Sequence, residues 1–160
     1  FKEVLLEGYA PHGIAILVEA ATDNNNRTVA NIRSYFNKCD GNLATSGSVD
    51  FLFKHLCFFQ IKDEGLDIEE LELDLIDFGA IDLSKSESEI SITANFENFG
   101  SIQKELEKRK LEITSSDFER EAINLKDLDE EKMIKVEKLI NMIDEDEDIQ
   151  NVYHNMKSEN

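Results

Sequence analysis

Residues 8–53 read GYAPHGIAILVEAATDNNNRTVANIRSYFNKCDGNLATSGSVDFLF, and the remaining chain is organised around them. This stretch holds four of the seven glycines and the only proline, so the sharpest turns are expected here. Pro11 and Gly13 favour a tight turn. The residues before it, 2–9, read as a strand. The apolar run 14–21 predicts a second, central strand that is covered on one or both faces and pairs with the first as a hairpin.

A helix is predicted from about residue 27 to residue 38. Residues 23–26 are good helix-capping residues, and the 3–4 spacing of Val29, Ile32 and Phe36 defines a buried stripe. Arg33 is expected at the edge of that stripe with its head turned outward. The side chains opposite the buried stripe are Arg27, Asn31, Ser34 and Lys38.

The helix is expected to end at Asp40-Gly41, with Gly41 just after the C-cap. The loop 41–49 offers hydroxyls and backbone amides that could cradle a phosphate. It lacks the Lys-Ser/Thr ending of a P-loop and precedes a strand, so a crossover turn is the favoured interpretation. Two strands, 49–53 and 56–61, are predicted to follow.

The composition changes abruptly at residue 63. A helix is then predicted to begin at Asp67, which is expected to act as its N-cap. Within the acidic segment that follows, strands are predicted at 80–84 and 89–94, a helix at 97–109 and a strand at 111–118. After it, the prediction is a short strand at 120–123, a helix capped by Asp127 and running to 143, and a strand at 149–155. This order predicts an α+β protein with a discontinuous first domain, 1–62 plus 119–160, and an inserted domain, 63–118.

The net charge of −18 is unevenly distributed. Residues 1–62 carry six Lys/Arg and six Asp/Glu, whereas 63–118 carry five against sixteen and 119–160 carry six against thirteen. Nucleic acid repels an acidic chain on average. An anionic partner is therefore expected to approach the first segment.

No residue pattern predicts a cofactor, a metal or a reaction. The two cysteines, Cys39 and Cys57, have no zinc-ligand spacing and are expected to be reduced thiols. The three histidines are scattered, and no apolar run reaches the ~18–20 residues of a membrane span. We expect a cytoplasmic monomer with no membrane or small-molecule partner, and a chain that has lost an N-terminal part.

Three motifs in the first third resemble the YebC/PmpR family. They are the turn that contains Gly8, Tyr9, Pro11 and Gly13, the helix start TDNNNRT, and the loop GNLATSGSV. That family includes probable bacterial transcriptional regulators and the mitochondrial translational activator of cytochrome c oxidase subunit I. The resemblance covers nearly the whole chain, although the sequence departs from the family at Ala10-Pro11-His12, where relatives more often have glycine beside the proline.

The resemblance implies a three-domain protein whose N-terminal helical domain is absent here. The two domains present would be small ferredoxin-like α/β sandwiches, one inserted in the other. It also implies a regulator of gene expression that binds nucleic acid, DNA in the first interpretation, without catalysis. Two alternatives remain open: a ribosome-associated translation factor that contacts RNA and ribosomal proteins, and a protein-interaction module with no nucleic-acid contact.

The candidate contact residues lie on the predicted helix 27–38 and its cap. Arginine offers a bidentate fork to phosphates, and asparagine offers both a donor and an acceptor to bases. The competing interpretation is a capped, solvated helix face. The candidates are Asn24, Asn26, Arg27, Asn31, Arg33 and Lys38.

Overall fold

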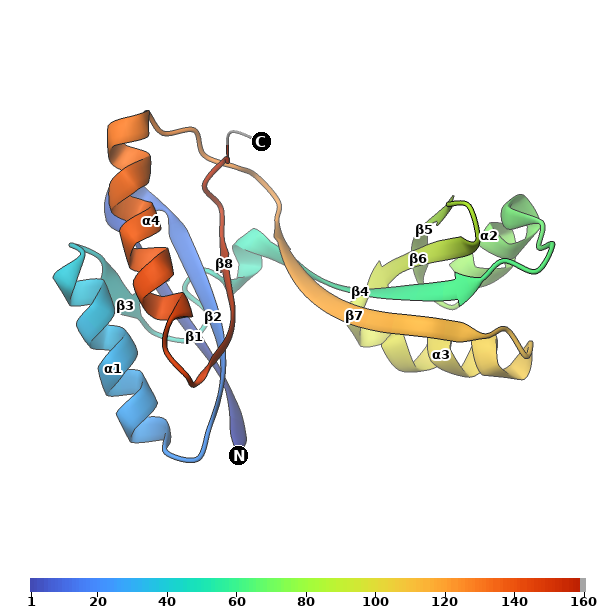
Figure 1. Ribbon diagram of the computed structural model, residues 1–160, viewed down its shortest axis with the longest axis horizontal. Helices are drawn as coiled ribbons and strands as arrows, with labels where there is room; N and C mark the ends of the chain where they lie inside the picture. The colour runs from blue at the N-terminus through green and yellow to red at the C-terminus, as the bar shows by residue number, and fades with distance from the viewer. Residues whose placement is uncertain (159–160) are drawn as a thin grey trace. The chain divides into compact units, whose positions relative to one another are not determined.

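The structure, a computed structural model, describes residues 1–158. The chain forms two compact units: unit 1 is Phe1–Phe53 with the segment that begins at Ala122, and unit 2 is Lys54–Glu121. Each unit has a four-stranded sheet with two helices (Figure 1). This confirms the predicted α+β class and the insertion of one sandwich in the other.

Unit 1 begins with the predicted hairpin. Its elements are β1 (Lys2–Tyr9), the 3-10 turn Pro11–Gly13, β2 (Ala15–Thr22), α1 (Asn25–Lys38), β3 (Asn42–Ala44), the 3-10 turn Asp50–Leu52, α4 (Glu130–Asp144) and β8 (Ile149–His154). The sheet order is β3-β1-β2-β8, and each neighbouring pair is antiparallel. The last strand of the chain therefore lies beside the second.

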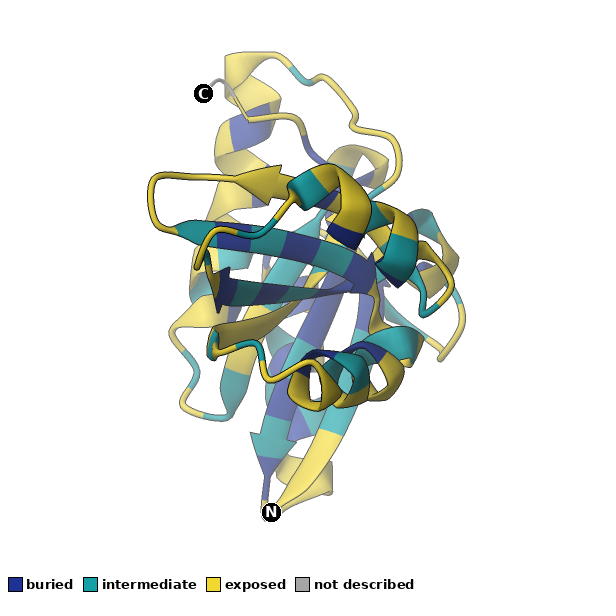
Figure 2. Ribbon diagram, turned by 90° about the vertical axis from the view of Figure 1, so that its right-hand side faces the viewer, coloured by how far each residue is buried: buried dark blue, intermediate teal, exposed yellow. Residues whose placement is uncertain are grey.

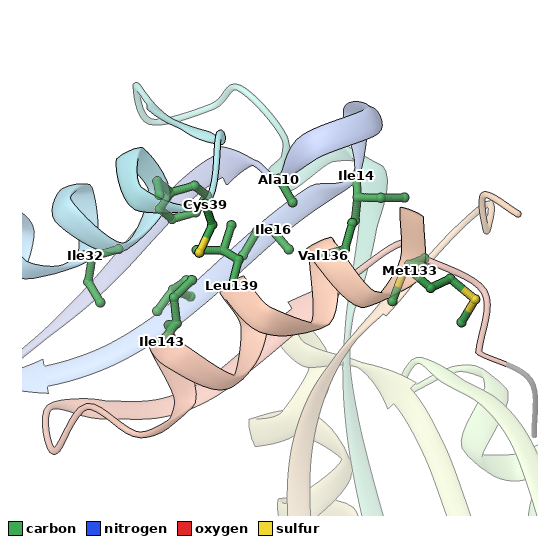
Figure 3. Packing of buried hydrophobic residues seen from close by; sticks show 12 residues of the cluster. Ala10, Ile14, Ile16, Ile32, Cys39, Met133, Val136, Leu139 and Ile143 are labelled. Atoms are coloured by element: carbon green, nitrogen blue, oxygen red, sulfur yellow. The ribbon is translucent and has the colours of Figure 1, made fainter. Parts of the chain in front are cut away.

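The apolar run of β2 is continuous because both of its faces are covered. Ile16 and Val18 point to the layer formed by α1 and α4, while Ala15 and Leu17 point to a smaller cluster on the other face. Figure 3 shows Ile32 of α1 and Val136, Leu139 and Ile143 of α4 converging on the first face. The smaller cluster is completed by Val49 and Phe53.

Unit 2 has the connection order of a ferredoxin-like sandwich. Its elements are β4 (Phe53–Lys62), α2 (Ile68–Ile76), β5 (Ala80–Lys85), β6 (Glu89–Asn95), the 3-10 turn Phe96–Asn98, α3 (Phe99–Lys108) and β7 (Ile113–Ala122). The sheet order is β5-β6-β4-β7, and β6 pairs antiparallel with both β4 and β5.

Both helices of unit 2 bury one stripe against the same face of the sheet. Leu71 and Leu75 of α2 and Ile102 and Leu106 of α3 pack with Phe59 of β4. Figure 2 shows these helices near the viewer, with buried residues on one side and exposed ones on the other. Hydrophobic residues at 3–4 spacing produce this stripe.

The domain boundaries differ from the prediction. The predicted boundary 62/63 falls at the end of β4, and the predicted boundary 118/119 falls inside β7. The two units instead divide at 53/54, at the start of β4, and at 121/122, at the end of β7. The predicted strands 49–53 and 56–61 are instead a 3-10 turn followed by the single strand β4. The predicted strands 111–118 and 120–123 are likewise one strand, β7.

Local turn chemistry was assigned correctly in one case and incorrectly in two. Asp67 caps α2 as predicted. The cap of α4 is Asp129, not Asp127, because Lys126 is held extended by backbone hydrogen bonds to Asn155 and Lys157. After α1 the positive φ of 58° belongs to Asp40, not Gly41. Gly41 is needed instead because the backbone passes close to β1: a Cβ at this position would lie 2.6 Å from the carbonyl oxygen of Tyr9.

Candidate nucleic-acid interface

The helix-start motif TDNNNRT supplies the hydrogen bonds that cap the N-terminus of α1. The Asn24 side chain accepts a hydrogen bond from the Arg27 amide (3.1 Å) and so caps the helix. The Thr22 hydroxyl accepts from the Asn24 amide (3.0 Å). Asn24 and Asn26 are exposed, so the cap residues still face solvent. Capping thus accounts for Asn24 but not for Asn26.

The same motif ties α1 to the turn between α4 and β8. Arg27 pairs with Asp148 (3.1 Å) and with Asp23 (3.2 Å). The Thr28 hydroxyl donates to Asp148 (2.8 Å). The hydrogen bond from Thr28, and then the Arg27 guanidinium, lower the pKa of Asp148, while Asp148 raises the pKa of Arg27. The buried stripe of α1 accordingly includes Thr28, and Val29 is only partly buried.

A hollow of about 450 Å³ beside this contact has an acidic wall. It is lined by Arg27, Asn31 and Tyr35 of α1 and by residues 145–148. The Tyr35 hydroxyl donates to Asp146 (2.7 Å), and this hydrogen bond raises the pKa of Tyr35 to about 12. Four consecutive carboxylates therefore surround two of the predicted contact residues, Arg27 and Asn31.

The other outward side of α1 has a different character. A shallow hollow of about 430 Å³ is lined by Ala30, Arg33, Ser34, Asn37 and Lys38. The side chains of Arg33, Asn37 and Lys38 are exposed around the small residues Ala30 and Ser34. Among residues 1–158, neither Arg33 nor Lys38 has a carboxylate partner. Arg33 is exposed and lines this hollow. We call this hollow the α1 outer face.

The loop after β3 binds an anion of the protein itself. The amides of Gly47 (2.7 Å), Val49 (2.9 Å) and Asp50 (2.8 Å) donate to the carboxylate of Glu7, which is only 2% exposed. The crossover turn therefore folds around a buried carboxylate of β1, which occupies the amides that a phosphate would need. The sequence analysis did not single out Glu7, although the residue immediately precedes the Gly8 motif.

The motif turn is held both by close packing and by polar contacts: the Ala10 amide donates to the Ile14 carbonyl oxygen (2.8 Å), and the Lys126 ammonium group donates to the Gly13 carbonyl oxygen (3.3 Å). A Cβ at Gly8 would lie 2.6 Å from the Asn42 carbonyl oxygen and 2.8 Å from Cε1 of Phe36. Pro11 opens the 3-10 turn, in which His12 (φ 66°) and Gly13 (φ 74°) are both left-handed. Tyr9, the last residue of β1, is 36% exposed. The motif residues thus shape the turn between β1 and β2. None of Gly8, Tyr9, Pro11 and Gly13 lines the α1 outer face.

No group of three His, Cys, Asp or Glu side chains within residues 1–158 has the arrangement of a metal site. Cys39 and Cys57 are free and buried, and burial raises the pKa of the Cys57 thiol. Within the same residues, no helix combines the length and apolar character needed to cross a bilayer.

The chain matches known proteins along nearly its whole length. The model of the TACO1/YebC second and third domain matches residues 1–156. A probable transcriptional regulatory protein of Flavobacterium johnsoniae is 61% identical over 159 residues, which cover 99% of this chain and 67% of the relative. One of Porphyromonas gingivalis is 52% identical over 160 residues, covering 99% of this chain and 66% of the relative.

A solved structure shows the same fold. The crystal structure of a conserved hypothetical protein from Aquifex aeolicus is 36% identical and superposes with a TM-score of 0.68, covering 98% of this chain and 65% of that one. The chain thus spans about two thirds of the length of the proteins it matches. On the family match and these identities, the chain belongs to the TACO1/YebC family.

Proposed function

We propose that this protein is a non-enzymatic, cytoplasmic regulator of gene expression that contacts nucleic acid, DNA in the first instance, through the α1 outer face. The observation that carries the proposal is the pair Arg33 and Lys38, which flank a shallow hollow and lack carboxylate partners among residues 1–158. Relatives at 52–61% identity are named probable transcriptional regulatory proteins, which supports the regulatory role.

Arg33 and Lys38 are better placed for phosphate contact than Arg27 and Asn31. A phosphate at Arg27 would have to displace Asp148 from the guanidinium and would meet residues 145–148 at short range. A phosphate at the α1 outer face meets Ala30, Ser34 and Asn37, which carry no charge. Asn37 adds a side-chain donor that the sequence analysis did not select.

Binding by this chain alone should be weak and sensitive to salt. Unit 1 carries nine Lys/Arg against seventeen Asp/Glu, a net of −8, which opposes an anionic partner. Each phosphate contact also releases counterions, so affinity falls as salt rises. The α1 outer face must therefore attract a phosphate at short range, although the net charge of unit 1 repels it.

The test is a low-salt filter-binding titration of duplex DNA and of single-stranded RNA. Replacing Arg33 and Lys38 together by Glu should abolish retention, because both contacts become repulsive. The matched control replaces Lys104 and Lys108 of α3, which are likewise exposed and unpaired within the described chain, by Glu. Circular dichroism monitors folding. Equal losses in both variants would show a general charge effect and overturn the assignment.

A second candidate function is docking to a basic protein surface, as on a ribosome. Unit 2 favours it, since it carries eight Lys/Arg against eighteen Asp/Glu, a net of −10. Sedimentation of the full-length protein with polysomes separates the two candidates. Co-migration with ribosomal particles supports docking, whereas free sedimentation with promoter-specific retention supports DNA binding.

A further inference from the structure

Strand β7 leaves one edge of the unit 2 sheet uncovered. It is the last strand in the order β5-β6-β4-β7, and Figure 1 shows it beside β4 at the margin of that sheet. Residues 114–119 are all exposed and contain neither proline nor lysine, the residues that commonly block such an edge. The Phe118 amide donates to the neighbouring Asp117 carboxylate (2.8 Å), so a local side chain satisfies this donor.

The two faces of β7 differ in chemistry. On one face, Ser115, Asp117 and Glu119 line a hollow of about 320 Å³ together with Phe58 and Gln60 of β4. Neither Asp117 nor Glu119 has a cationic partner among residues 1–158. This face therefore offers two carboxylates that lack a cationic partner within the described residues, beside Phe58.

On the opposite face, Phe118 joins a partly exposed aromatic cluster. Its ring meets Phe96 edge-on, with centroids 5.2 Å apart, and lies 4.9 Å from Phe99. Phe96 in turn stacks on His55 at 3.9 Å. Phe96 and Phe118 remain 42% and 41% exposed. Partly exposed aromatic faces attract apolar side chains and the guanidinium of arginine.

We propose that the β7 edge accepts an extended, arginine-bearing segment of a partner protein as an added strand. Main-chain hydrogen bonds along a free edge supply affinity, and alternate side chains supply specificity. Basic side chains on one face of the segment would meet Asp117 and Glu119, and alternate side chains on the other would cover Phe96 and Phe118. The net charge of −10 on unit 2 selects a cationic occupant over RNA. This goes beyond the nucleic-acid proposal and names a surface for the docking candidate.

The probe is a ten-residue peptide in which arginine alternates with valine, titrated into the 160-residue chain by fluorescence anisotropy in low salt. A glutamate–valine peptide and a single-stranded RNA serve as comparisons. The arginine peptide should bind, and hydrogen exchange of residues 114–119 should slow at least tenfold on binding. Replacing Asp117 and Glu119 together by Lys should weaken binding at least tenfold.

Two further variants separate strand addition from simple attraction. Replacing Asp82 and Glu87, exposed acids of β5 and its turn, by Lys makes the same change in net charge and should alter affinity less than twofold. Ser116→Pro should weaken binding at least tenfold, because proline removes a backbone N–H donor from the middle of the edge strand and is poorly tolerated in a strand that pairs on both sides. Circular dichroism checks each fold.

Any of four results overturns the proposal: no binding of the arginine peptide, tighter binding of RNA, equal losses in the two charge-reversal variants, or unchanged binding by a folded Ser116→Pro protein. None of these results bears on the Arg33 and Lys38 titration. The two proposals can therefore fail separately.

Discussion

At the scale of single residues, Glu7 is a buried acid that organises a loop of unit 1. Its buried carboxylate accepts three backbone amides from residues 47–50 and so fixes the loop that leads into unit 2. Hydrogen bonds to a charged group contribute about 1.5–3 kcal/mol each, and an unsatisfied buried donor is costly. A loop rich in glycine and serine is ordered here by an acid from another strand.

We expect Glu7→Gln to lower the free energy of unfolding by about 2–3 kcal/mol, because an amide loses the charge and places a donor against backbone donors. Denaturant titration measures the change. Glu3→Gln, an exposed residue of the same strand, is the control and should change stability by less than about 0.5 kcal/mol. Equal effects would mean that the Glu7 contacts add little.

We expect His154 to make the stability of the protein depend on pH on the acid side of neutrality. Burial lowers the pKa of its imidazole, an effect that nearby Glu137 partly offsets, and its Nδ1 accepts the Met156 amide (3.1 Å). The unfolded chain, with a pKa near the ordinary 6.5, therefore binds the proton more readily than the folded one. Stability should be fully present above pH 6.5 and fall as the pH drops below it.

Thermal melts between pH 5.5 and 7.5 measure this dependence. His154→Gln should flatten the profile in that window, since glutamine does not titrate. The control His12→Asn replaces an exposed histidine with a residue that tolerates its left-handed φ. A slope that survives His154→Gln would assign the dependence to other groups.

At the scale of elements, helix starts combine local caps with distant contacts. Asp129 accepts the Lys132 amide (3.0 Å) at the start of α4. Asp127 is exposed, and its nearest cation, Lys157, is 3.9 Å away. The backbone bridge between Lys126 and Met156 keeps the chain extended until Asp129. Tertiary pairing therefore decides which aspartate becomes the cap.

Asp129→Ala should destabilise unit 1 by about 0.5–2 kcal/mol through loss of the N-cap. Asp127→Ala should change stability by less than about 0.5 kcal/mol, because it removes only an exposed charge. Denaturant melts of the two variants give the comparison. The reverse order of effects would place the start of α4 at Asp127.

At the scale of the whole molecule, the hydrophobic core is divided between the units. Two clusters lie within unit 1, and the third, which contains Leu106, lies within unit 2. Because each cluster closes within one unit, a cavity should destabilise the unit that contains it. Sub-global opening of this kind is reported by native-state hydrogen exchange.

Leu106→Ala should lower the stability of unit 2 by about 2–5 kcal/mol. Hydrogen exchange should accelerate in β4, β6 and α3, while the protected amides of β1 and β2 should change little. The matched change in unit 1 is Leu139→Ala, a fully buried residue of α4, which should show the opposite pattern. Equal acceleration in both units after either substitution would show that they unfold as one.

The sequence by itself determined the hairpin of β1 and β2, the positions of the four helices and the insertion of one sandwich in the other. These features depend on hydrophobic periodicity and turn residues, which are local signals. Only the tertiary structure decided which basic side chains of α1 have a carboxylate partner. Arg27 and Lys38 look equivalent on a helical projection, but Asp148, 121 residues beyond Arg27, neutralises only the first. It also decided the role of Glu7, because the three amides that donate to its carboxylate lie 40, 42 and 43 positions further along the chain. Periodicity shows which way a side chain points, but its partner depends on where the rest of the chain returns.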